Sequence, residues 1–205
     1  VPKIVSLYPQ SAKYSVERIT DGLGNRHEFK YEYLLPKNTN PFYEYDYQWV
    51  NDDVRTIPIP VRALCADTVF AINNIRCVTT YSYKNLMFNN KGRGVLGFES
   101  KKSKHYINNE LQQSDYFENS FDFVDDYNIL LPKSNSIYNY CNQLVSSESY
   151  RYNIFVCTHN NKVLMPSMRC KTTINYDNDN PETILNTRVE NIDYQSDMSS
   201  NYYSD

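Results

Sequence analysis

With 205 residues, the chain is long enough for one domain with a sizeable core or for two small ones. Its net charge of -3 gives no electrostatic argument for a nucleic-acid partner, and no stretch approaches the roughly 18 apolar residues of a membrane-spanning helix. The 20 tyrosines and the many asparagines favour strands and turns over helices, because tyrosine suits half-buried pleated surfaces and asparagine suits turns.

The first predicted element is a hairpin. Residues 14–20 have the pattern of a strand, and the turn that follows contains Asp21, Gly22, Gly24 and Asn25. An Asp-Gly pair is a strong hairpin signal. Residues 26–33 alternate aromatic and charged side chains, which is typical of a strand with one buried face.

An aromatic stripe is predicted next. Residues 43–49 alternate aromatic and polar side chains, so we expect a strand whose aromatic face consists of Tyr43, Tyr45, Tyr47 and Trp49. Two interpretations remain open. The rings form either a sheet face packed on a neighbouring strand or an exposed amphipathic platform for a glycan or a protein.

A second hairpin is predicted from residues 61–72 and 75–83, followed by a loop over 85–90. Three of the five glycines then fall within nine residues. Glycine is favoured where the backbone needs a positive φ or where another chain passes too close for a Cβ, so we expect a structural turn here. The residues assigned to it are Gly92, Arg93, Gly94, Gly97 and Phe98.

The remaining sequence continues the strand pattern. A short helix competes only weakly over residues 107–117, and further strands are predicted at 121–123, 129–131, 137–145, 150–158, 162–165, 168–176 and 184–194. The predicted fold is therefore all-β, with antiparallel hairpins in an extended or spiralling sheet and little helix. We expect a hairpin array over 1–176 and an acidic C-terminal strand with a frayed tail over 177–205.

No group of residues has the spacing of a catalytic, cofactor or metal site. The histidines, His27, His105 and His159, are isolated in the sequence, and the five cysteines show no CxxC pair. Residues 177–181 lack the glycine and glutamate of a calcium loop and are expected to form a turn. The sequence therefore predicts no enzyme, no cofactor and no bound metal.

Two segments resemble a known family. Residues 18–31 resemble an Rhs/YD repeat, in which a T-D-x-x-G-N turn precedes a strand ending in tyrosine. Tyr81-Ser82-Tyr83 and the glycine motif of residues 92–98 resemble the "Y-x-Y … G-R-G-F-L-G-F" region of the B component of insecticidal toxin complexes and of related virulence-plasmid proteins. Val95 stands where that family usually has phenylalanine.

This resemblance implies a piece of a β-strand shell that encapsulates or carries a toxin polypeptide, in a secreted or cell-surface protein. The implied partners are other segments or subunits of the same toxin assembly and the enclosed toxic polypeptide. Shells of the Rhs type are closed by an aspartyl self-cleavage segment with an Asp-Pro pair, which is absent from this sequence, so no autoproteolysis is assigned. The alternative is a tyrosine-rich surface module that binds a glycan or a protein.

Overall fold

The computed structural model describes the chain over residues 15–35, 40–48, 52–71, 75–92, 94–124, 127–156 and 164–192. Within these ranges all regular structure is β, as the sequence predicts. The 12 strands are β1 (Arg18–Thr20), β2 (Arg26–Leu34), β3 (Tyr43–Glu44), β4 (Val54–Thr56), β5 (Val61–Phe70), β6 (Arg76–Asn89), β7 (Gly94–Ile107), β8 (Glu110–Val124), β9 (Tyr127–Asn139), β10 (Leu144–Val156), β11 (Leu164–Tyr176) and β12 (Ile184–Asn191).

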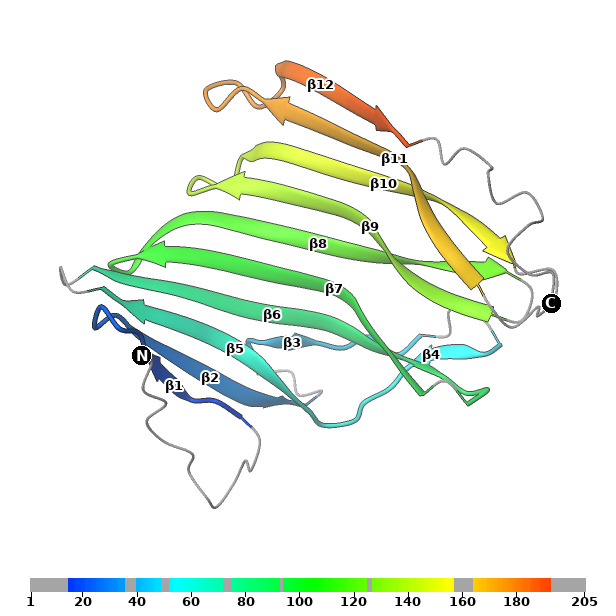
Figure 1. Cartoon of the computed structure of the whole chain (residues 1–205), viewed down its shortest axis with the longest axis horizontal. Helices are drawn as coiled ribbons and strands as arrows, with labels where there is room; N and C mark the ends of the chain where they lie inside the picture. Colours follow the sequence, from blue (N-terminus) through cyan, green and yellow to red (C-terminus); the bar gives the residue numbers. More distant parts are fainter. Residues whose placement is uncertain are drawn as a thin grey trace.

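All strands belong to one sheet, in the order β1-β2-β5-β6-β7-β8-β9-β10-β11-β12, with β3 and β4 paired to β6 beside this path. From β5 onward each strand lies beside the strand that follows it in the chain, and each of these pairs is antiparallel (Figure 1). Consecutive hairpins therefore build the sheet edge to edge, which confirms the predicted fold class. The described residues include no helix able to span a membrane.

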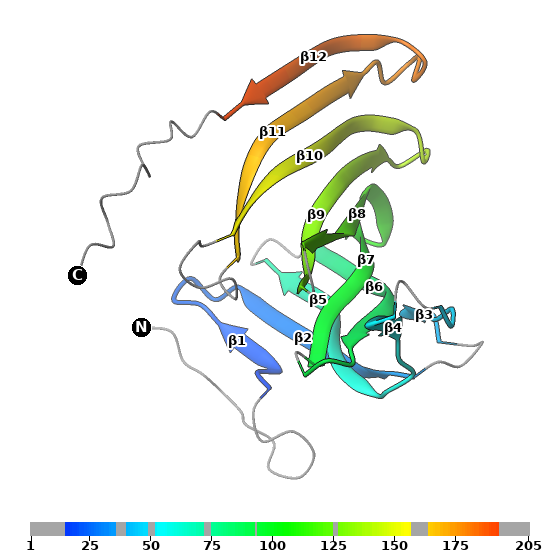
Figure 2. The same ribbon diagram turned by 90° about the vertical axis from the view of Figure 1, so that its right-hand side faces the viewer.

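The sheet is strongly curved. A register shift interrupts every strand pair from β6–β7 to β11–β12 and also the β2–β5 pair. Such bulges bend the strand that carries them and increase its right-handed twist. Figure 2 shows the result: β1 and the end of β12 lie toward the left of the view, whereas β3 and β4 lie on the right.

One edge of β6 is shared by three strands in succession. β5 pairs with β6 only along its last residues, 66–70, and its first residues pair with β2 alone. The rest of that edge is taken by β3, parallel to β6, and by β4, antiparallel to β6. Residues 40–48 and 52–57 therefore lie along the second half of β6 and protect an edge that would otherwise expose unpaired backbone groups.

The main hydrophobic cluster lies at this junction. Leu34, Tyr43, Ile57, Cys65 and Leu86 are at most 8% exposed and pack together. They come from five different parts of the chain, so the cluster joins the 40–57 segment to the sheet.

The aromatic segment departs from the predicted strand. β3 ends at Glu44, and beyond it two backbone N–H groups donate to side chains. The N–H of Asp46 donates to Asn85 Oδ1 at 2.7 Å, and the N–H of Gln48 donates to Thr56 Oγ1 at 3.0 Å. Side-chain acceptors therefore replace part of the expected ladder, and one backbone hydrogen bond remains, from the N–H of Thr56 to the carbonyl of Gln48 at 3.0 Å.

Three other predicted elements also differ. The expected loop at 85–90 belongs largely to β6, where Leu86 and Met87 are buried and paired with β7. The competing helix at 107–117 is a tight turn followed by β8. The predicted strand 137–145 is broken because Asn139 Oδ1 accepts the N–H groups of Cys141 and Gln143, each at 3.0 Å, and so forms a turn.

Candidate functional site

The first predicted turn is fastened by one carboxylate. Asp21 Oδ1 accepts the N–H groups of Leu23 and Asn25 at 2.9 Å each, and Asn25 Nδ2 donates to Asp21 Oδ2 at 2.8 Å. Gly24 adopts a φ of 89°, which favours glycine. The hydrogen bond from the Asn25 side chain, together with those from backbone N–H groups, lowers the pKa of Asp21 below 3.8 and outweighs desolvation. Gly22 lies in the same turn.

The second glycine motif is not a single turn. Gly92 lies in the turn between β6 and β7, Arg93 falls outside the described residues, and Gly94 is the first residue of β7. Gly97 and Phe98 lie within β7, which corrects their assignment to a turn. The strand pairing explains this, because Met87 faces Gly97 and Phe88 faces Val95, so Leu96 forms a bulge.

Gly97 lies at a close approach of two strands. It has a φ of 136°, and a Cβ placed on it would lie 2.8 Å from Leu130 Cδ2 in β9. The pairing of β7 with β8 begins only at Ser100, so no β8 ladder holds the first part of β7 away from β9. The motif therefore marks a close approach of β7 to the Leu130 side chain at a backbone conformation that favours glycine.

The aromatic stripe is divided between the core and the surface. Tyr43 is 5% exposed, Tyr45 is half-buried against the same cluster, and Tyr47 is 63% exposed. Trp49 lies outside the described residues. The described part of the stripe is therefore neither a uniform buried face nor a continuous exposed platform.

Tyr43 is the anchor of this segment. Its hydroxyl accepts the N–H of Leu86 at 3.1 Å, and its ring lies edge-on to Phe98 with 6.3 Å between centroids. Tyr83 also packs on Phe98, with 4.7 Å between their ring centroids, and its hydroxyl donates to the carbonyl of Leu64. Burial raises the pKa of Tyr43 and raises that of Tyr83 to about 12.

A buried polar clasp holds the chain after Tyr45. Asn85 is 1% exposed and has a φ of 47°, and its Nδ2 donates to Glu99 Oε2 at 2.5 Å. Gln48 Nε2 donates to the same oxygen at 3.3 Å. Thr56, also 1% exposed, donates its hydroxyl to the carbonyl of Asp46 at 2.9 Å. The clasp satisfies polar groups that would destabilise the fold if buried without partners.

A cavity of about 550 Å³ lies beside this segment. Its floor comes from two adjacent cross-strand rows. In one, Ser82 of β6, Lys102 of β7 and Tyr116 of β8 are in register, and in the other, Lys84 faces Ser100. Residues in register share a face of the sheet, and rows two residues apart are separated by about 7 Å.

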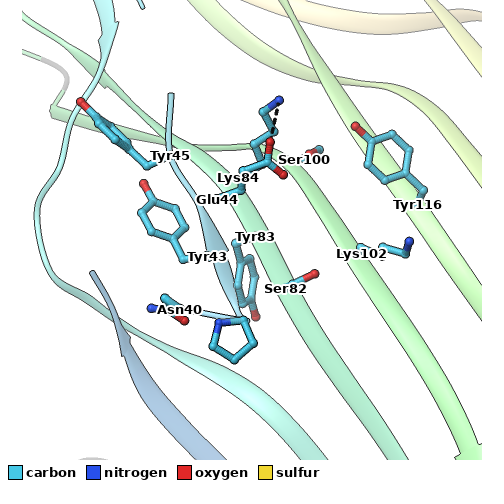
Figure 3. Close-up of a pocket in the computed structure, with 11 residues that line it drawn as sticks. Asn40, Tyr43, Glu44, Tyr45, Ser82, Tyr83, Lys84, Ser100, Lys102 and Tyr116 are labelled. Atoms are coloured by element: carbon cyan, nitrogen blue, oxygen red, sulfur yellow. Dashed lines mark ion pairs between the residues drawn. The ribbon is translucent and has the colours of Figure 1, made fainter. Parts of the chain in front are cut away.

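The wall of the cavity is the strap formed by residues 40–45. Figure 3 shows the Lys84 ammonium directed at Glu44, with Tyr43 and Tyr45 to one side and Tyr116 and Lys102 to the other. Lys84 Nζ lies 3.3 Å from Glu44 Oε1 and 3.4 Å from Asp46 Oδ2. Desolvation opposes its charge, but the two carboxylates outweigh this and raise the pKa of Lys84.

A second polar cluster could not be found from the sequence. His105 Nε2 lies 2.6 Å from Asp115 Oδ2, and His105 Nδ1 lies 3.1 Å from Thr79 Oγ1. Ser103 and Gln113 also donate to the Asp115 carboxylate. These residues come from β6, β7 and β8 and meet only through strand register, so their spacing in the chain carries no signal. The cluster links three neighbouring strands across one face.

The histidine, cysteine and acidic residues considered from the sequence as metal ligands do not come together in the described part of the chain. Within the described part of the chain, no group of three or more histidine, cysteine or acidic side chains could hold a metal ion. Cys65, Cys77, Cys141 and Cys170 are free thiols, and Cys65 is completely buried.

No family model matches the sequence. No curated protein matches it either. Solved structures do resemble the fold. The complexes TcdB2-TccC3-Cdc42 and TcdB2-TccC3 match with TM-scores of 0.54 and 0.56, at 12% and 11% identity over 78% of this chain. The Photorhabdus luminescens Tc holotoxin pore matches with a TM-score of 0.57, at 12% identity over 80% of this chain.

The likeness is one of fold. At these sequence identities it shows that the curved antiparallel sheet resembles the fold of parts of Tc toxin chains, and it does not assign this chain to their family. The chain covers 10%, 11% and 10% of the three matched chains, so it spans about a tenth of their length.

Proposed function

We propose that this chain is a structural segment of a β-strand shell that encloses or carries a polypeptide in a toxin-complex-like assembly, and that it is not itself an enzyme. The observation that carries the proposal is the curved sheet of consecutive long antiparallel strands, together with its likeness to Tc toxin chains. The resemblance of the two glycine-containing motifs to Rhs repeats and to the toxin B component supports the same role. On this proposal the protein acts outside the cell that makes it.

The physical properties of the sheet suit a wall. Its strands from β6 to β11 are 13 to 15 residues long, and most of their described side chains are half-buried. Bulges in successive pairs give a persistent bend, and edge-to-edge pairing lets the surface extend in either direction. A wall of this kind requires no catalytic group. The His105–Asp115 cluster then serves to hold neighbouring strands together.

The proposal is tested on the protein encoded by the full open reading frame that contains this sequence. Two thiols report on the wall, because Cys65 is buried and Cys141 is exposed. The protein is treated with protease and a thiol reagent over a series of urea concentrations, and mass spectrometry identifies the cleaved and labelled residues. We expect Cys141 to react in the native protein, and an enclosed polypeptide to become cleavable only when Cys65 also reacts.

Two results would contradict enclosure by this protein, and a third would contradict the wall itself. One is rapid digestion of every segment outside the sheet while Cys65 stays protected, since nothing would then be enclosed. The other is a compact particle without a hollow interior by electron microscopy. Loss of Cys65 protection before any urea is added would show that the wall itself does not form.

A further inference from the structure

The cavity under the 40–45 strap offers binding groups that the fold does not use. Its volume of about 550 Å³ falls in the usual range for small-molecule sites, about 300–1,000 Å³. Four tyrosines contribute to its lining. Tyr43, Tyr45 and Tyr83 also pack in the core cluster, whereas Tyr116 is half-buried outside it and offers an apolar ring face together with a polar hydroxyl. Ser100, which is 3% exposed, also contributes to the lining.

The two lysines that line the cavity differ in their partners. Lys84 is neutralised by Glu44 and Asp46, whereas no described carboxylate pairs with Lys102. On the same face, the nearest other carboxylate in the strand register is Glu118, and it is paired with Lys133 at 2.9 Å. Lys102 is therefore a cation at the cavity whose partner is not supplied by the described part of the chain.

The neighbours of Lys102 are also available. Ser82 and Tyr116 flank it in the same cross-strand row, and neither hydroxyl has a hydrogen-bond partner among the described residues. Directly opposed side chains in an antiparallel pair have their Cβ atoms about 5 Å apart. One ammonium and two hydroxyls therefore lie in a row about 10 Å long, beside the strap.

We propose that this cavity binds a carboxylated saccharide of one or two rings. The carboxylate would accept hydrogen bonds from Lys102, and the ring hydroxyls would bind Ser82 and the Tyr116 hydroxyl. The apolar face of the sugar would lie against the ring of Tyr116, which shares a face of the sheet with Lys102. The combination of one unpaired cation, a row of hydroxyls and the half-buried ring of Tyr116 selects this ligand over a simple anion, which has no apolar face, and over a neutral sugar, which leaves the cation unpaired. The inference is independent of the shell proposal.

The test uses the full chain and three probes: methyl glucuronide, methyl glucoside and acetate. Binding is measured by ligand-observed NMR and by calorimetry. We expect the glucuronide to bind at least about tenfold more tightly than the glucoside, which is the effect of one charge-assisted hydrogen bond, and acetate to bind still more weakly. Lys102→Gln should remove the preference for the glucuronide, and Tyr116→Ala should weaken both sugars.

Lys104→Gln is the matched control. Lys104 lies two residues along β7 on the same face but does not line the cavity, so its loss should leave binding unchanged. Equal loss in the Lys104 and Lys102 variants would overturn the proposal in favour of nonspecific attraction to lysines. Equal binding of acetate and glucuronide would show that the cavity is only an anion site. No binding of any probe would reject the proposal. Circular dichroism of each variant verifies that the sheet is intact.

Discussion

Gly97 in β7 and Leu130 in β9 approach each other so closely that a Cβ on Gly97 would lie 2.8 Å from Leu130 Cδ2. β7 and β9 are not hydrogen-bonded neighbours, because β8 lies between them in the sheet order. Neighbouring strands are about 4.8 Å apart, so next-nearest strands normally lie about 10 Å apart. The Leu130 side chain reaches Gly97 because β8 pairs with β7 only from Ser100 onward.

The first prediction concerns this close approach. Gly97→Ala should lower the free energy of unfolding by about 1–2 kcal/mol, because the positive φ disfavours alanine and the end of the Leu130 side chain must shift to make room for the new methyl group. Gly92→Ala is the control, since Gly92 has a φ of 103° but no atom lies within 4 Å of the place that an added Cβ would take. It should carry only the backbone cost. Urea unfolding measures both, and equal losses in the two variants would contradict the crowding at Gly97.

The second prediction concerns the anchor of the strap. Tyr43→Phe removes the acceptor of the Leu86 N–H, and Leu86 is 2% exposed. A buried donor without a partner costs about 1–3 kcal/mol, so we expect a loss of that size in urea unfolding. Tyr47→Phe makes the same chemical change at a residue that is 63% exposed, and it should have no measurable effect. Similar unfolding curves for both variants would mean that Tyr43 contributes through its ring alone.

The hairpins and the fold class could be predicted from the sequence because their signals are local. The Asp-Gly turn and the alternation of residues 26–33 lie within one hairpin, and strand alternation is visible at short range. The path of the 40–48 segment could not be predicted in this way. Its backbone groups bind Asn85 and Thr56, and nothing in the sequence near Asp46 indicates those partners.

The other features that could not be predicted depend on the register between strands that are distant in the sequence. The glycine motif indicated special backbone geometry correctly, but the reason for Gly97 lies in β9, two strands further along the chain. The His105–Asp115 pair and the floor of the cavity likewise depend on which residues of β6, β7 and β8 face one another. A shift of one residue would reverse the face of every side chain, so these sites follow from register and not from spacing along the chain.

The third prediction concerns the buried clasp. Asn85→Gly keeps a residue that tolerates the φ of 47° but removes the hydrogen bonds to Glu99 and to the N–H of Asp46. We expect a loss of about 2–3 kcal/mol in urea unfolding, because a carboxylate loses a buried donor and a backbone N–H loses its acceptor. Hydrogen exchange should also show earlier opening of the segment around Asp46.

Asn142→Gly is the control for the clasp. Asn142 has a φ of 61° in an exposed turn, so glycine there should leave stability nearly unchanged. If Asn85→Gly likewise left the free energy of unfolding nearly unchanged, the polar contacts of Asn85 would not hold the segment.

The fourth prediction concerns the first turn in acid. The hydrogen bond from the Asn25 side chain is the largest influence that lowers the pKa of Asp21 below 3.8. A depressed folded-state pKa contributes stability above pH 3.8, and that contribution is lost as the pH falls through the folded value. Asp21→Asn removes the titration, so its urea midpoint should fall less than that of the wild type between pH 5 and about pH 2. Parallel decreases in the two proteins would contradict the role of the carboxylate.

The fifth prediction concerns the sheet in alkali. Burial raises the pKa of Tyr83 from 10.0 to about 12, so the folded state keeps its phenolic proton after the unfolded state has lost it. The contribution to stability is complete below pH 10 and is lost as the pH rises toward about 12. The shift corresponds to about 1–2 kcal/mol once partial solvent screening is allowed for. Tyr83→Phe should be less stable at pH 8, because it loses the bond to the Leu64 carbonyl, but its stability should fall less steeply above pH 10. Urea unfolding of both proteins at several alkaline pH values measures the two slopes, and equal slopes would show that another group controls the alkaline transition.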